Sequence, residues 1–171
     1  GPVVKIPLDA DGNGTSDDGK QITGTMKGEG TFVEGAVDNS YRIEKKGWIE
    51  YGDAFSFEKD QAFTVSAWLR LKPAGGSPFG KMEATGGARG WDVEFHGTKP
   101  SFHLISQWPA NAVHVQGQRD LPVDTFLHLA VTYDGSGKAA GVQMYVNGQP
   151  EKTNAVVDTL TETIRTPEPF S

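Results

Sequence analysis

The sequence contains no cysteine and no apolar run of the roughly 18 residues needed to cross a bilayer. Without cysteine, disulfide scaffolds, thiolate nucleophiles and cysteine-based zinc sites are excluded. Basic residues are also in the minority, with 16 Lys and Arg against 22 Asp and Glu and a net charge of -6. Because nucleic acids and anionic membranes bind basic surfaces, we expect neither nucleic-acid binding nor membrane insertion.

Helical periodicity is missing as well, and strict alternation of apolar and polar residues takes its place. From Phe63 to Leu71 every second residue is apolar, which predicts a half-buried strand. The other segments with this pattern, bounded by Gly, Pro, Asn or Asp, are 91–96, 101–106, 112–116, 126–133 and 142–147. The sequence therefore predicts an all-β fold, a two-sheet antiparallel sandwich of the jelly-roll type.

The length of 171 residues suits one domain whose core is large enough to fold without disulfides. Gly1-Pro2 resembles the remnant that a protease leaves when an affinity tag is removed. The predicted single domain therefore spans residues 3–171. We expect it to come from a longer protein in which a neighbouring domain accompanies it.

Five segments resemble a known family: FTVSAW at 63–68, GWDVEF at 90–95, FHLIS at 102–106, HLAVTYDG at 128–135 and MYVNG at 144–148. They are similar to the laminin-G-like domains of bacterial secreted proteins, within the concanavalin A-like lectin/glucanase superfamily. The resemblance implies a jelly-roll sandwich and a secreted, cell-surface or periplasmic location. The superfamily includes lectins, enzymes and adhesion modules, so the resemblance leaves the function open.

One departure from this family concerns the end of the chain. Such domains close with a further strand, and residues 166–171 do not contain one. Either the sequence ends before that strand, or the strand comes from elsewhere. A missing strand would leave an unpaired sheet edge, which favours pairing with another chain.

The sequence contains no complete catalytic motif. The glucanases of this superfamily carry Glu-x-Asp-x-Glu on one strand, and here Asp92 and Glu94 match while Gly90 takes the position of the nucleophile. Serine-hydrolase, zinc-protease and phosphate-loop motifs do not occur. We predict a noncatalytic domain and keep a glycoside hydrolase or lyase as the third alternative.

A structural calcium site is one interpretation of the polar segment near the start of the chain. Asp9, Asp11, Asn13 and Asp17 offer oxygen ligands at alternating positions, which suits a hard cation. The twelfth position of this loop is Lys20, where a bidentate Glu would be expected. The other interpretation is a polar turn capped by Asp and Asn side chains, as the resemblance implies.

The polar faces of the strands predict a recognition surface. If the aliphatic residues fill the core, all four histidines, His96, His103, His114 and His128, point outward together with polar and aromatic side chains across one sheet. These histidines could in principle bind zinc, but the sequence does not fix them within ligand distance of one another. The loop 107–111 adds Trp108, stiffened by Pro109, which either stacks on a sugar or folds over the sandwich edge as a plug.

We predict a noncatalytic carbohydrate-binding module that recognises a polysaccharide by aromatic stacking and side-chain hydrogen bonds. The alternative is a structural or adhesion module that docks another protein. Trp68 also has a packing interpretation, in which it fills space beside Arg70. The predicted carbohydrate-binding residues are Trp108, Asn111, Gln107, His103, His114, Gln116, Trp68, Arg70, Asp92 and Glu94.

Overall fold

A computed structural model describes residues 3–171, apart from the side chains of residues 44 and 45. The tag remnant predicted at residues 1–2 lies outside the described residues. The chain divides into two compact units, an N-terminal unit of residues up to 54 together with 169–171, and a sandwich unit of residues 55–168. The prediction of a single domain over 3–171 stays a prediction.

The N-terminal unit is built from hairpins. A small antiparallel sheet joins β1 (Val4–Lys5), β2 (Gly14–Ser16) and β3 (Gln21–Ile22), and a long hairpin joins β4 (Thr25–Glu34) to β5 (Asn39–Glu50). The last residues of the chain belong to this unit, because the Phe170 backbone N–H donates to the Gly52 carbonyl over 2.9 Å.

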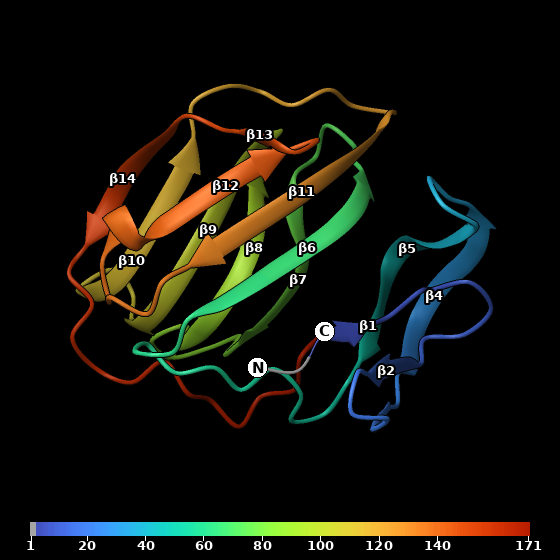
Figure 1. Ribbon diagram of the computed structural model, residues 1–171, viewed down its shortest axis with the longest axis horizontal. Coiled ribbons are helices and arrows are strands. Elements are labelled where there is room, and N and C mark those ends of the chain that lie inside the picture. The colour runs from blue at the N-terminus through green and yellow to red at the C-terminus, as the bar shows by residue number, and fades with distance from the viewer. Residues whose placement is uncertain (1–2) are drawn as a thin grey trace. The chain divides into compact units, whose positions relative to one another are not determined.

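The sandwich unit consists of two antiparallel sheets that lie as two layers (Figure 1). The five-stranded sheet has the order β14-β10-β9-β8-β7, and the four-stranded sheet has the order β13-β12-β11-β6. The bounds are β6 Phe63–Arg70, β7 Gly76–Met82, β8 Gly90–His96, β9 Lys99–Gln107, β10 Asn111–Gly117, β11 Phe126–Tyr133, β12 Val142–Val146, β13 Gln149–Pro150 and β14 Thr153–Asp158. The antiparallel jelly-roll sandwich predicted from the sequence is confirmed.

The core of this unit lies between the two sheets. Phe102 and Leu104 of β9 are fully buried, and Leu127 and Leu129 of β11 in the other sheet are 0% and 2% exposed. Aromatic side chains fill one part of this core, where the rings of Phe63 and Phe102 lie 6.1 Å apart between centroids. Each strand contributes every second residue, so the residues in between point away from the core.

Every strand predicted from alternation is present, with ends shifted by at most a few residues. The only helical segment among residues 3–171 is a short 3-10 turn, Ala139–Gly141. No described helix has the length and apolar character that crossing a membrane requires. Residues 159–171, which follow β14, contain no strand, and they therefore do not supply the closing strand that the family resemblance implied.

Candidate functional site

The outer face of the five-stranded sheet carries two rows of polar side chains. Strand register places Asp92 of β8 beside His103 of β9, and His103 beside His114 of β10. The next row runs from Glu94 through Ser101 to Gln116 across the same strands. These residues alternate with the buried aliphatic residues, so the two rows lie on the side of the sheet that faces away from the core.

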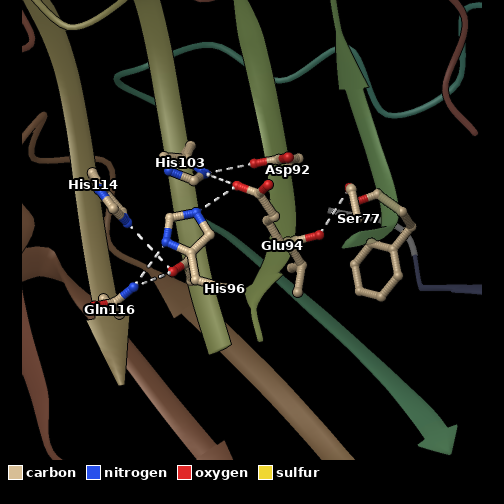
Figure 2. A network of polar contacts seen from close by, with 10 residues as sticks. Ser77, Asp92, Glu94, His96, His103, His114 and Gln116 are labelled. Atoms are coloured by element: carbon tan, nitrogen blue, oxygen red, sulfur yellow. Dashed lines mark hydrogen bonds and ion pairs between the residues drawn. The ribbon is translucent and has the colours of Figure 1, made fainter. Parts of the chain in front are cut away.

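Two carboxylates hold two imidazoles in this cluster (Figure 2). The Nδ1–H of His103 donates to Asp92 Oδ1 over 2.8 Å, and the Nε2–H of His96 donates to Glu94 Oε2 over 2.9 Å. The Gln116 amide donates to Nδ1 of His96 over 2.9 Å. Both imidazoles are therefore fixed in orientation and in tautomer, with the proton on the nitrogen that faces the carboxylate.

His114 differs from the other two because one of its ring nitrogens has no partner. Its Nε2 lies 3.3 Å from the Ser101 hydroxyl, while its Nδ1 is buried without a hydrogen bond. The side chain is 4% exposed. Burial, and to a lesser extent the neighbouring rings of His103 and His96, lowers the pKa of His114 from its ordinary 6.5 to about 4. His114 is neutral at pH 7.

The expectation that all four histidines face water is wrong for two of them. His103 and His114 do lie on the outer face, but they are only 5% and 4% exposed. The reason is Trp108, whose ring meets the ring of His103 edge-on at 5.4 Å and that of His114 at 5.7 Å. The loop after β9 thus covers the histidine row, which strand alternation cannot reveal.

Trp108 itself remains accessible. Its side chain is 42% exposed although its ring lies against His103 and His114, so covering these rings leaves much of the indole open to solvent. Below it lie the imidazoles, and beside them Glu94 and Gln116 are half-buried. An exposed indole next to side chains with free hydrogen-bonding capacity is the kind of surface that takes an amphipathic ligand.

The predicted single recognition surface is in fact divided between the two sheets. Trp68 and Arg70 belong to β6 of the four-stranded sheet, whereas Asp92, Glu94 and the three clustered histidines belong to the five-stranded sheet. Trp68 is 51% exposed and meets the ring of His128 at 5.3 Å. Trp68 thus points outward as predicted, and its packing beside Arg70 stays a prediction. Sequence alternation shows which residues point outward, but it does not show to which sheet each strand belongs.

Two residues of the loop 107–111 have different surroundings. The Asn111 side chain donates to the Thr161 hydroxyl over 2.7 Å and accepts from the Thr161 and Glu162 backbone N–H groups, at 2.9 and 3.2 Å. Asn111 thus fixes the segment that follows β14, with its amide oxygen and one amide N–H engaged in hydrogen bonds. Gln107 is exposed at the end of β9. Ser101 is not among the residues predicted from the sequence; it is fully buried and accepts a hydrogen bond from Gln116 over 3.3 Å.

The position of the missing nucleophile cannot accommodate a side chain. Gly90 has a φ of +141°, and a Cβ placed on it would lie 2.0 Å from the Lys81 carbonyl oxygen. Asp92 and Glu94 are each held by a histidine, as described above. A three-carboxylate glucanase site is therefore not formed at this strand.

The polar segment near the start of the chain forms turns. Asp11 Oδ1 accepts from the Asn13 backbone N–H at 2.8 Å, Asn13 Oδ1 accepts from Gly24 at 3.1 Å, and Asp9 Oδ1 accepts from Asn39 at 3.2 Å. Among the described residues, these carboxylates and Asp17 do not form a group of three with ligand atoms within 4.8 Å. The calcium prediction has not been tested and stays a prediction.

Metal-ligand distances occur instead in the histidine cluster. One nitrogen from each of His96, His103 and His114 lies within 4.8 Å of the other two, and the same holds for ligand atoms of Asp92, Glu94 and His103. Alternation along the chain does not predict that these side chains meet, because they come from three strands whose pairing it does not show.

Comparison with known proteins identifies the family. A family model named Laminin_G_3, described as the concanavalin A-like lectin/glucanases superfamily, matches residues 44–169. The chain belongs to this superfamily. The match covers the whole sandwich unit, including β8, β9 and β10 with their polar rows. No match was found among curated protein sequences.

Solved structures of the same fold include binding domains. The chain is similar to domain 4 of AbnA, a GH43 extracellular arabinanase from Geobacillus stearothermophilus, solved in complex with arabinotriose. The TM-score is 0.55 and the identity 16%, over 91% of this chain and 75% of that one. It is also similar to the botulinum neurotoxin serotype G binding domain, with a TM-score of 0.57 and 10% identity over 95% of this chain.

A third similar structure is the binding domain of botulinum neurotoxin DC in complex with rat synaptotagmin II. Its TM-score is 0.61 and its identity 11%, over 99% of this chain. This chain spans only 44% and 45% of the two neurotoxin domains. At these identities the similarity concerns the fold.

Proposed function

We propose that this domain is a noncatalytic carbohydrate-binding module of a larger secreted bacterial protein, with its site on the outer face of the five-stranded sheet. The observation that carries the proposal is Trp108, an exposed indole whose ring contacts His103 and His114, while Glu94, His96 and Gln116 lie on the far side of these two imidazoles. The ring would stack on the apolar face of a sugar, while these three side chains exchange hydrogen bonds with its hydroxyl groups.

Three further observations support this proposal. The superfamily includes lectins, and AbnA domain 4 was solved with an oligosaccharide. The site combines two carboxylates with three imidazoles, and it therefore offers no excess of positive charge for a polyanion. A shallow site of this kind exchanges sugar–water for sugar–protein hydrogen bonds, so we expect dissociation constants from about micromolar to millimolar.

The decisive experiment is a polysaccharide array followed by calorimetry with Trp108→Ala. We expect affinity to fall at least about tenfold, or about 1.4 kcal/mol, because an accessible aromatic anchor is lost. Trp68→Ala is the matched control, since Trp68 is at least as exposed but lies on the four-stranded sheet, and it should bind like the unmodified chain. Equal losses in the two variants, or no binding to any polysaccharide, would contradict the proposal.

Hydrolysis or cleavage by a lyase is tested on the same polysaccharides. Release of reducing sugar should be undetectable, because the nucleophile position is a glycine without room for a side chain. Turnover that disappears in Glu94→Gln would replace the binding proposal by the enzymatic alternative.

A docking module is the second candidate, and the edge of the four-stranded sheet favours it. β6 has a hydrogen-bonded neighbour, β11, on one side only. Its inward-facing Phe63, Val65, Ala67 and Leu69 are half-buried, whereas the inward-facing residues of β11 are buried. A further strand added to β6 would cover them. This candidate predicts self-association or partner binding that is weakened by a lysine at the edge, as in Ser66→Lys, and no polysaccharide binding.

A further inference from the structure

The histidine cluster has the composition of a metal site that differs from the calcium site expected near the start of the chain. Its three imidazoles come from β8, β9 and β10, and one nitrogen from each lies within 4.8 Å of the others. Zinc bound tetrahedrally at about 2.0–2.1 Å needs ligand nitrogens about 3.4 Å apart. Metal binding would therefore draw the three rings closer together by rotation of their side chains.

The carboxylates of the cluster prepare two of these rings as ligands. Asp92 accepts the Nδ1 proton of His103, which leaves the lone pair of a neutral His103 on Nε2. Glu94 accepts the Nε2 proton of His96, so the lone pair of His96 is on Nδ1, where it now accepts the Gln116 amide. A carboxylate behind an imidazole fixes the tautomer and raises the basicity of the metal-binding nitrogen.

The third ring, that of His114, has a nitrogen without a hydrogen-bond partner, and a cation would provide one. His114 is 4% exposed and its Nδ1 has no hydrogen-bond partner. A buried polar atom without a partner costs free energy, about 1–3 kcal/mol. In the neutral ring the lone pair is on Nδ1 or on Nε2, depending on the tautomer. Rotation about the Cβ–Cγ bond can direct that nitrogen toward His96 and His103. Coordination would give His114 a partner that the protein itself does not provide.

The ligand type selects the class of metal. Three neutral nitrogens suit zinc, copper or nickel ions, whereas calcium prefers six to eight oxygen ligands. Asp92 and Glu94 would balance the charge of a divalent ion without being direct ligands. Access is open on the side of His96, whose side chain is 44% exposed. Three histidines and an open fourth position are also the arrangement found in zinc sites that keep a bound water.

We propose that His96, His103 and His114 bind one divalent transition-metal ion of the zinc type, through one ring nitrogen each, with a water molecule in the fourth position. Asp92 and Glu94 act as positioning residues for His103 and His96. The metal would lie on the same sheet face as the proposed sugar-binding residues, beside Trp108. The proposal itself requires no glycan, so it stands or fails independently of the proposed function.

The test is a titration of the metal-free full chain with Zn²⁺ by calorimetry and with Co²⁺ by absorption spectroscopy. We expect one equivalent of Zn²⁺ to bind and Co²⁺ to give the intense visible bands of a tetrahedral nitrogen site. Adding Ca²⁺ should change neither signal. Binding of Zn²⁺ at no defined stoichiometry, or Co²⁺ bands of an octahedral hydrated ion, would overturn the proposal.

Variants locate the metal. His96→Ala removes a largely exposed ligand and should abolish the tetrahedral Co²⁺ spectrum, while circular dichroism shows the fold retained. Asp92→Asn should weaken Zn²⁺ binding about 10- to 100-fold, the usual effect of losing the carboxylate behind a ligand. His128→Ala is the matched control, because His128 belongs to the four-stranded sheet and should leave binding unchanged. Zn²⁺ binding that survives in His96→Ala, or is lost in His128→Ala, would show that the cluster is not the site.

Discussion

Acid should destabilise this domain through His114 in a way that one substitution can isolate. The buried His114 ring contacts the rings of His103, His96 and Trp108, and its Nε2 lies next to the Ser101 hydroxyl. The nearest carboxylates, Asp92 and Glu94, are bonded to His103 and His96. Burial lowers the pKa of His114 to about 4 in the folded chain, against 6.5 when it is unfolded. Between these values the unfolded chain binds the proton and the folded chain does not.

The sign and size of the effect follow from proton linkage. Because the unfolded state holds more protons between pH 4 and 6.5, the free energy of unfolding rises with pH in this window and levels off above it. The slope approaches about 1.4 kcal/mol per pH unit, so His114 accounts for a loss of up to about 3 kcal/mol as the pH falls from 6.5 to 4.

The assay is urea unfolding at a series of pH values from 4 to 7.5, in the presence of a chelator, for the unmodified chain and for His114→Gln. The glutamine keeps a polar side chain of similar length but does not titrate. Subtracting the two curves should leave a line that rises up to about pH 6.5 and is flat above it. NMR of the His114 ring should place its titration near pH 4. A flat difference curve, or a ring that titrates near 6.5, would refute the reasoning.

Further predictions concern the residues that hold the site in place. Asn111→Ala should lower the free energy of unfolding, measured in urea, by about 1–2 kcal/mol, because three hydrogen bonds to the segment after β14 are lost. Polysaccharide affinity should not change. A loss of affinity without a loss of stability would contradict this structural role of Asn111. Gly90→Ala should cost more than about 2 kcal/mol and lower Tm, because the alanine Cβ meets the Lys81 carbonyl and the backbone φ is +141°; a variant as stable as the unmodified chain would contradict this.

Alternation along the chain was sufficient to predict six strands of the sandwich, β6 and β8 to β12, but not β7, β13 or β14. The segment 126–133 was predicted from the sequence with the bounds that β11 has, because each residue's side of a strand depends only on its place in a local pattern of period two. The outward direction of His103 and His114 was also predicted correctly. Their burial was not, because it depends on the Trp108 loop folding back over the sheet.

The sequence by itself determined the all-β class, the inward and outward faces of each strand, the exclusion of cysteine chemistry and the lack of a nucleophile at Gly90. Only the tertiary structure decided which strands share a sheet. That assignment separates Trp68 and Arg70 from the other predicted binding residues and brings one nitrogen from each of three histidines, on three neighbouring strands, within 4.8 Å of the others. The physical reason is that side-chain direction is a local property of a strand, whereas strand pairing and loop placement depend on contacts between residues distant in sequence.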